Sequence, residues 1–326
     1  MRAAPPGWRE PHWTARHERP AETPLRASSA ATTRSAATMT RSPHGNPAFL
    51  SLAHLTLIDA DPLTLVDAAA AGRFDAIGLR IVPPMPTDRI VPVIGDEVLI
   101  RDIERRLDAT GIRVFDIEAV WLTPETDVVR LRPALELGAR LGANHLLVVG
   151  NDPEAGRLRD NFAGLCDLAA GFGIGVALEM MSYVALNTLP KAFRLLDEVR
   201  RPNARLLIDA LHLMRSGGKP ADLVGLSPAL FPYVHLCDAA AARPPDLERL
   251  RYEGRGGRFY PGEGELPLVD LMHALPADIA VAVEAPCAAY AGLSPLERAR
   301  ICGAATRALL NAAQAARTAA QWGKRE

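Results

Sequence analysis

Eight short apolar segments recur along this chain at intervals of about 30 residues, which is the spacing of successive strand–helix units. Each segment is rich in Val, Ile, Leu and Ala and lacks the regular apolar–polar alternation of a half-exposed strand. A strand that is apolar throughout is buried on both faces, which is typical of a parallel sheet covered by helices. The predicted strands are residues 48–55, 75–81, 112–120, 144–150, 174–180, 204–210, 233–239 and 279–285.

Amphipathic helical patterns separate these segments, and several begin at a capping Asp or Thr and end at Gly. They cover residues 61–72, 96–111, 128–142, 155–173 and 188–201, and a final Ala-rich helix runs from 294 toward Trp322. Eight such units in about 250 residues have the size of a closed (β/α)8 barrel. A doubly wound open sheet is the alternative, but the first strand–helix turn, HLTLIDADP, contains no GxGxxG. The sequence therefore predicts an α/β TIM barrel, a single domain over residues 46–326.

Residues 1–45 have a different character, because they are rich in Ala, Arg, Pro, Ser and Thr and show no apolar periodicity. They contain no apolar core of a secretory signal. Their Arg/Ser bias is that of an organellar presequence, but Glu10, Glu18 and Glu22 argue against one. Met39 is an alternative start, just before the ordered pattern begins. We expect a disordered extension without a function of its own.

Charge and cysteine content narrow the functional classes. The 326 residues carry a formal net charge of −1, which is not the basic footprint of a protein that binds nucleic acid or anionic membranes. No apolar run reaches the roughly 18–20 residues of a membrane span. The four cysteines form no CxxC pair, which argues against a disulfide framework or a zinc ribbon and favours a reducing compartment. We expect a cytoplasmic protein with a small-molecule partner and with no nucleic-acid or membrane partner.

Polar side chains end or interrupt four successive predicted strands. Glu179 ends the fifth strand, Asp209 the sixth and Glu284 the eighth, and His235 lies within the seventh. In a TIM barrel the C-terminal strand ends surround the active site. Taken alone, Asp209 is equally well explained as the N-cap of the next helix. A lone His in an apolar strand is more often a hydrogen-bonded core residue than a ligand.

The two glutamates are harder to explain as structural residues. Each follows an aliphatic run, GVAL before Glu179 and AVAV before Glu284, and burial of an unpaired carboxylate is costly. No Lys or Arg is expected near the site in these strands, so a divalent cation is the natural partner of the four side chains. Three carboxylates and one imidazole favour one Mn²⁺, Mg²⁺ or Co²⁺ ion over Zn²⁺.

The chain resembles the xylose isomerase-like TIM-barrel superfamily, in the branch of sugar-phosphate isomerases and epimerases. The resemblance covers residues 48–315 and rests on the motifs VALEM, LLIDALH, YVHLCD, PGEGELPL and VAVEAP. It implies that Glu179, Asp209, His235 and Glu284 bind one metal ion and that His212 contacts the substrate.

The same superfamily contains endonuclease IV-type enzymes with a multinuclear metal cluster. Those enzymes need further histidines at the ends of the second and third strands. Here these strands read IGLRIVPP and VFDIEAVW, with Arg80, Glu118 and Trp121 but no His. The sequence therefore argues against DNA cleavage.

The leading functional hypothesis is a metal-dependent isomerase or epimerase that acts on a small ketose-like substrate. The metal ion polarises a carbonyl and acidifies the neighbouring C–H, and Glu179 and Glu284 act as base and acid through an enediolate. One alternative is a metal-dependent dehydratase (a lyase) of the same superfamily, such as a 3-dehydroshikimate or keto-inositol dehydratase. Another is a non-catalytic sugar-binding barrel. The expected partner is thus a polyhydroxy or keto-acid small molecule, and the apolar helices are compatible with a homo-oligomer.

Further residues are candidates for substrate contact. The long segment 238–267 either closes over a phosphate or carboxylate of the substrate or is a solvated excursion. His54 either lines the pocket or is a buried hydrogen-bonding residue, and Trp121 at a strand end can stack on a sugar ring. The predicted substrate-binding residues besides His212 are Arg243, Arg258, His54, Arg80 and Trp121.

Overall fold

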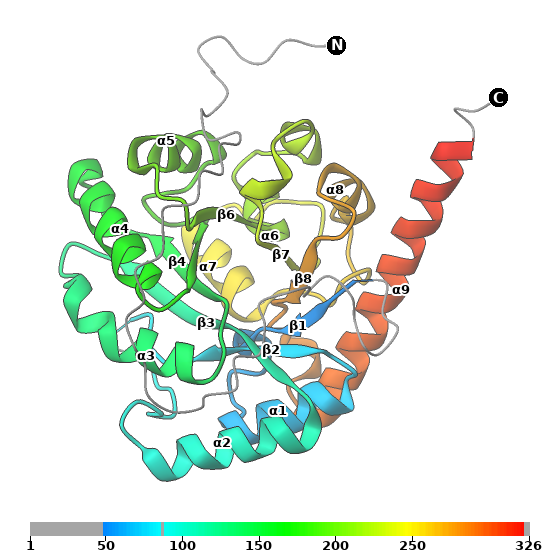
Figure 1. Ribbon diagram of the computed structural model, residues 1–326. Helices are drawn as coiled ribbons and strands as arrows, with labels where there is room; N and C mark the ends of the chain where they lie inside the picture. The colour runs from blue at the N-terminus through cyan, green and yellow to red at the C-terminus, as the bar shows by residue number, and fades with distance from the viewer. Residues whose placement is uncertain (1–47, 86–87, 323–326) are drawn as a thin grey trace. The chain divides into compact units, whose positions relative to one another are not determined.

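The computed structural model describes residues 48–85 and 88–322, and the predicted extension with its alternative start Met39 lies outside them. Eight parallel strands close into a barrel in which each strand pairs with the next and β8 pairs with β1 (Figure 1). The predicted TIM barrel is confirmed. The strands are β1 (Leu50–Leu52), β2 (Ala76–Arg80), β3 (Arg113–Leu122), β4 (His145–Gly150), β5 (Gly175–Glu179), β6 (Ala204–Asp209), β7 (Tyr233–Leu236) and β8 (Ala280–Val283).

Helices surround the barrel, and the long C-terminal helix α9 packs along the outside against α1 and α8 (Figure 1). The α-helices are α1 (Pro62–Ala71), α2 (Glu97–Thr110), α3 (Arg132–Arg140), α4 (Ala155–Ala170), α5 (Leu189–Val199), α6 (Ala210–Arg215), α7 (Leu247–Gly256), α8 (Leu268–Ala274) and α9 (Pro295–Trp322). Short 3-10 helices are η1 (His54–Leu57), η2 (Val128–Leu131), η3 (Pro220–Leu223), η4 (Pro228–Leu230) and η5 (Ala288–Tyr290).

The helix boundaries follow from local capping. The Asp61 carboxylate accepts the backbone N–H groups of Leu63 and Thr64 at the start of α1, and Asp96 caps α2 in the same way. At the end of α2, Gly111 adopts a positive φ of 74°, a conformation that glycine takes without the steric cost of a Cβ. These sequence signals place the ends of the helices close to the predicted residues.

The segment after β7, for which the sequence left open either a closing loop or a solvated excursion, contains a helix, α7. The Asp246 carboxylate caps this helix by accepting the backbone N–H of Arg249 at 2.8 Å, and Leu250 is buried beneath it. Cap and buried face together stabilise the helix although its last turn contains Gly254 and Gly256. In Figure 1, α7 projects onto the middle of the ring of strands.

The barrel interior is divided along its axis. An aromatic group fills its N-terminal part: the ring of Phe115 lies 5.3 Å from that of Phe49, 5.1 Å from that of Tyr233 and 5.0 Å from that of His145. Glu179 and Asp209 instead end their strands, and Glu284 directly follows β8, at the other, C-terminal end of the barrel.

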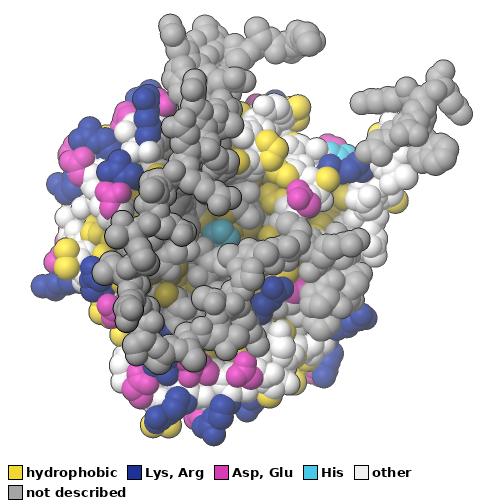
Figure 2. All heavy atoms as spheres, in the orientation of Figure 1, with side chains coloured by type: hydrophobic (Ala, Val, Ile, Leu, Met, Phe, Trp, Pro, Cys, Tyr) yellow, Lys and Arg dark blue, Asp and Glu magenta, His cyan; other side chains and the backbone are white. Residues whose placement is uncertain are grey.

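The surface visible in Figure 2 carries side chains of both charges. Basic and acidic side chains are interspersed around the face shown in Figure 2, in keeping with the near-zero net charge. None of the helices in residues 48–85 and 88–322 is both long and apolar enough to cross a membrane.

Candidate metal centre and active site

Four side chains converge at the C-terminal ends of adjacent strands. Glu179 is the last residue of β5, Asp209 the last of β6, and Glu284 directly follows β8. His235 in β7 stands in register with Asp209. One potential ligand atom from each of the four residues lies within 4.8 Å of all the others, and the residues are at most 2% exposed.

Most polar atoms of this cluster lack a hydrogen-bond partner. His235 Nδ1 lies 3.7 Å from Glu179 Oε1 and 3.6 Å from Glu284 Oε2, too far for good hydrogen bonds. Within the described part of the chain, both carboxylate oxygens of Glu179 and both ring nitrogens of His235 are unpartnered. Buried polar atoms are seldom left so, and three carboxylates beside an imidazole are suitable ligands for a divalent cation. The four residues therefore fit a divalent metal site.

A buried arginine also lies in the site. Arg258 Nη1 donates to Asp209 Oδ2 at 2.6 Å, and Arg258 Nη2 lies 3.0 Å from Glu284 Oε2. The expectation that these strands bring no Lys or Arg near the site did not extend to the segment after β7. After α7 the chain returns to the strand ends and brings in Arg258, which was predicted as a substrate-binding residue. Arg258 compensates two of the carboxylates, but it leaves Glu179 and His235 without a hydrogen-bond partner among the described residues.

The pKa values of the two glutamates are displaced in opposite directions. Burial raises the pKa of Glu179 to about 7. Burial acts on Glu284 in the same sense, but His235 and Arg258 outweigh it and hold the pKa of Glu284 below its ordinary value. Burial opposes a charge on His235, yet the carboxylates of Glu284 and Glu179 raise its pKa well above the ordinary value. Two carboxyl groups with pKa values pushed apart are typical of an acid–base pair.

Asp209 is at once a cap and a member of the cluster. Its Oδ1 accepts the backbone N–H of His212 at 2.8 Å, which begins α6, while its Oδ2 faces Arg258. The two interpretations of Asp209 are therefore compatible.

The His212 ring lies beside the cluster. It is fully buried and stands edge-on to the Tyr183 ring, with 5.2 Å between centroids. Its Nδ1 lies 3.4 Å from Ser182 Oγ and its Nε2 lies 3.5 Å from Arg258 Nη2. Burial lowers the pKa of His212 to about 4, so this imidazole is neutral near pH 7.

A second polar group occupies the β1–β3 side of the barrel. Arg80 Nη2 lies 3.4 Å from Glu118 Oε2, and Glu118 Oε1 accepts the backbone N–H of His54 at 3.0 Å. His54 Nδ1 accepts the backbone N–H of Arg80, and its Nε2–H donates to the Ala60 carbonyl. Burial lowers the pKa of His54 to about 4. Both ring nitrogens of His54 are thus used in hydrogen bonds that hold the ends of β1 and β2.

Asp116 and Tyr233 belong to the same interior but were not predicted from the sequence. The Tyr233 hydroxyl donates to Asp116 Oδ2 at 3.3 Å. Burial, and then the nearby charge of Glu118, raise the pKa of Asp116 to about 8. The pattern Asp-x-Glu in β3 could have predicted that Asp116 lies on the same face of the strand as Glu118, because residues two apart on a strand share a face.

The remaining predicted substrate residues lie farther out. Arg243 is exposed, and its Nε donates to the backbone carbonyl of Arg215 at 2.9 Å. Trp121, near the end of β3, is half-buried and packs against the apolar residues of the barrel interior. The structure therefore brings Arg258 and His212 to the cluster and leaves Arg243 on the surface.

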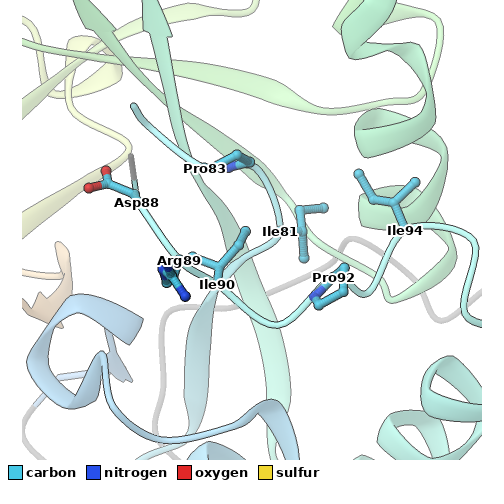
Figure 3. Close-up of a pocket in the computed structure, with 7 residues that line it drawn as sticks. All are labelled: Ile81, Pro83, Asp88, Arg89, Ile90, Pro92 and Ile94. Atoms are coloured by element: carbon cyan, nitrogen blue, oxygen red, sulfur yellow. The ribbon is translucent and has the colours of Figure 1, made fainter. Parts of the chain in front are cut away.

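A surface hollow lies apart from the cluster. It has a volume of about 450 Å³, and Figure 3 shows its lining along the segment that follows β2, where the Asp88 carboxylate points away from Ile81 and Ile94. Asp88 instead pairs with Arg255 of α7 at 2.7 Å. This ion pair ties α7 to the segment after β2.

The chain matches a known protein family over most of its length. Residues 65–323 match the family model described as the xylose isomerase-like TIM barrel. The chain belongs to that family. The resemblance inferred from the five sequence motifs is confirmed. The family model covers every strand after β1, including the four that carry the cluster.

Solved structures of other proteins share the fold at low sequence identity. The IOLI protein, crystallised with a bound zinc atom, aligns over 80% of this chain and 97% of its own, with a TM-score of 0.67 and 18% identity. The probable 3-dehydroshikimate dehydratase AsbF of Bacillus anthracis aligns over 78% and 97%, with a TM-score of 0.62 and 16% identity. D-allulose 3-epimerase of Methylomonas sp., solved in complex with D-allulose, aligns over 78% and 94%, with a TM-score of 0.55 and 18% identity.

One curated relative matches a short stretch of the sequence. A 3-dehydroshikimate dehydratase of Bacillus anthracis is 38% identical over 58 residues, which is 18% of this chain and 21% of that protein. The match thus spans about a fifth of the relative's length.

Proposed function

We propose that this xylose isomerase-like barrel is a divalent-metal-dependent isomerase or epimerase of a small ketose-like substrate. The observation that carries the proposal is the convergence of Glu179, Asp209, His235 and Glu284 within 4.8 Å at the C-terminal end of the barrel. Family membership and the structural similarity to the Methylomonas D-allulose 3-epimerase support it. A non-catalytic sugar-binding barrel has no need of unpartnered carboxylates in its interior, and we place it last.

The four residues of the cluster would hold the ion. A bound divalent ion would polarise the substrate carbonyl and acidify the neighbouring C–H. Glu179 and Glu284 face each other across His235, so one carboxylate can take the proton from that carbon while the other carboxyl group returns a proton. Arg258 and the neutral His212 would donate hydrogen bonds to substrate oxygens. Burial excludes water and strengthens each of these interactions.

The proposed ion is Mn²⁺, Mg²⁺ or Co²⁺. Three carboxylates give the site a majority of oxygen ligands, which hard cations prefer. Zn²⁺ is the alternative, since the IOLI protein holds a zinc atom in a barrel of the same fold.

A metal-dependent dehydratase is the second candidate. Two observations favour it: the 58-residue match to a 3-dehydroshikimate dehydratase, and the position of two of the buried arginines, Arg80 and Arg258, in the polar interior of the barrel. A guanidinium beside the metal site suits a substrate carboxylate. In this reaction the same proton abstraction would be followed by loss of a β-hydroxyl group as water.

Proton NMR in D₂O tests the proposal and separates the candidates. The chelator-treated protein is mixed with Mg²⁺ or Co²⁺ and with ketoses, hydroxypyruvate, keto-inositol or dehydroshikimate. We expect metal-dependent deuterium uptake next to a carbonyl in one ketose-like compound, without loss of water. New vinylic signals would instead identify a dehydratase. Absence of both across the panel, in protein that binds the metal, would contradict the proposed isomerase.

A further inference from the structure

We propose that Glu253 and Gly254 of α7 are positioning residues that set Arg258 in the active site. The inference rests on the proposed metal site, and it adds two residues outside the strands that influence how this site binds a metal ion. Among the described residues, Glu253 and Gly254 form no hydrogen bond or ion pair with the four clustered side chains. Any effect of these two residues on metal binding is therefore expected to pass through Arg258.

Helix α6 provides three consecutive contacts to the chain from 253 to 258. Asp209, which caps α6, and His212 and Arg215 within it are spaced three residues apart, so they lie on one side of this short helix. Asp209 and His212 approach the Arg258 guanidinium at 2.6 and 3.5 Å. Arg215 reaches Glu253, one turn earlier in that segment. The segment is therefore aligned along α6 from the cluster outward.

The Arg215–Glu253 pair is a buried, two-pronged ion pair. Arg215 Nε and Nη2 donate to the two Glu253 carboxylate oxygens at 2.8 and 2.7 Å, and the side chains are only 3% and 12% exposed. Arg215 Nη2 also donates to the Ala240 carbonyl at 2.7 Å. A forked pair of this kind fixes the relative orientation of its partners as well as their distance. It holds α7 at one place on α6.

Gly254 brings α7 close to the residues around the cluster. A Cβ at this position would lie 2.8 Å from both Cε1 and Oη of Tyr183, whose ring stands against His212. The Gly254 carbonyl accepts the Nε–H of Arg258 at 3.0 Å. With Nε bound there, the planar guanidinium presents its other nitrogens to Asp209 and Glu284. A shift of α7 would therefore move Arg258 away from two proposed metal ligands.

The first test compares two glycine substitutions on the same helix. Gly254→Ala places a methyl group against Tyr183, whereas Gly256→Ala meets no atom within 4 Å. Loss of a group that orients metal ligands typically weakens metal binding about 10- to 100-fold. We expect Gly254→Ala to raise the Co²⁺ dissociation constant by about tenfold and to change the visible Co²⁺ spectrum, while Gly256→Ala changes the constant by less than about twofold.

A second pair of variants changes the charge of a side chain instead of its volume. It tests the same inference if the Gly254→Ala protein does not fold. Glu253→Gln breaks the fork to Arg215, and Glu248→Gln makes the same change at an exposed position of α7. We expect Glu253→Gln to raise the Co²⁺ dissociation constant by about tenfold and Glu248→Gln to change it by less than about twofold.

A double-mutant cycle separates positioning from a general loss of structure. Arg258→Lys keeps the charge but lacks the Nε–H that binds Gly254. If α7 acts through Arg258, adding Gly254→Ala to Arg258→Lys changes the Co²⁺ dissociation constant by less than about twofold. Equal effects of Gly254→Ala in both backgrounds, or wild-type Co²⁺ binding by both Gly254→Ala and Glu253→Gln, would overturn the inference. Failure of the wild-type protein to bind Co²⁺ would overturn the metal site itself.

Discussion

Replacement of Arg258 by Met is expected to lower the free energy of unfolding of the metal-free protein by about 3–5 kcal/mol. The reason is that Asp209 and Glu284 would remain buried beside each other without their cation. Breaking a buried pair by removing one partner leaves an uncompensated charge in a site that water does not reach. Urea unfolding in the presence of a chelator measures the loss.

Added metal should restore part of this stability, because an ion held by the cluster would take over the compensation of the two carboxylates. Arg255→Met is the matched control, since the Arg255 side chain is 49% exposed and that of its partner Asp88 is 18% exposed. Its loss should be about 1 kcal/mol or less. Similar losses in the two variants, or an Arg258→Met protein whose stability does not respond to metal, would contradict the assigned charge balance.

The second large effect is expected on turnover. Glu179→Gln and Glu284→Gln preserve shape but remove the proton-transferring group, and each should lower kcat by about 10²- to 10⁴-fold. The rate of deuterium uptake by the substrate identified by NMR is the direct readout. Because both residues are proposed ligands, the rates must be compared at saturating metal, with bound metal quantified in each variant.

Glu248→Gln is again the control, as an exposed glutamate on α7 that should leave the rate unchanged. Near-normal exchange in either active-site variant with metal bound would remove that glutamate from the acid–base pair. A loss in only one of the two would show that a single carboxylate carries the proton, with a different group on the opposite side.

The barrel and the metal cluster were accessible to prediction for different physical reasons. Continuous apolar strands at regular spacing leave few folds that bury them on both faces, so the (β/α)8 barrel follows from the pattern. The cluster follows from the barrel: once the strand ends are known to meet, Glu179, Asp209 and Glu284 at three of those ends must lie close together. Both inferences need only local sequence and a known architecture.

Arg258 and α7 depend on contacts between distant parts of the chain. Arg258 lies 49 residues after Asp209, and Glu253 lies 38 residues after Arg215. Nothing in the glycine-rich sequence around these residues specifies which partner they reach. The path of the chain after β7 is set by packing against α6 and Tyr183, which local patterns do not encode.

Asp116 shows a different limit. It carries a readable signal, two acidic residues with strand spacing in VFDIEAV, but that signal concerns the barrel interior below the strand ends. Because Asp116 lies before the end of β3, the pattern of polar residues at strand ends does not include it. Its partner, the Tyr233 hydroxyl, comes from the opposite side of the barrel and required the structure.

Calorimetric titration of Mn²⁺ or Co²⁺ into the chelator-treated protein measures directly whether the four clustered residues bind a metal ion. We expect one ion per chain, with binding that weakens as the pH falls through about 7, because protons on Glu179 and His235 compete with the metal. His235→Asn and Asp209→Asn should each lose most of the affinity. Absence of stoichiometric binding by the wild-type protein, or wild-type affinity in both variants, would contradict a metal centre at these four residues.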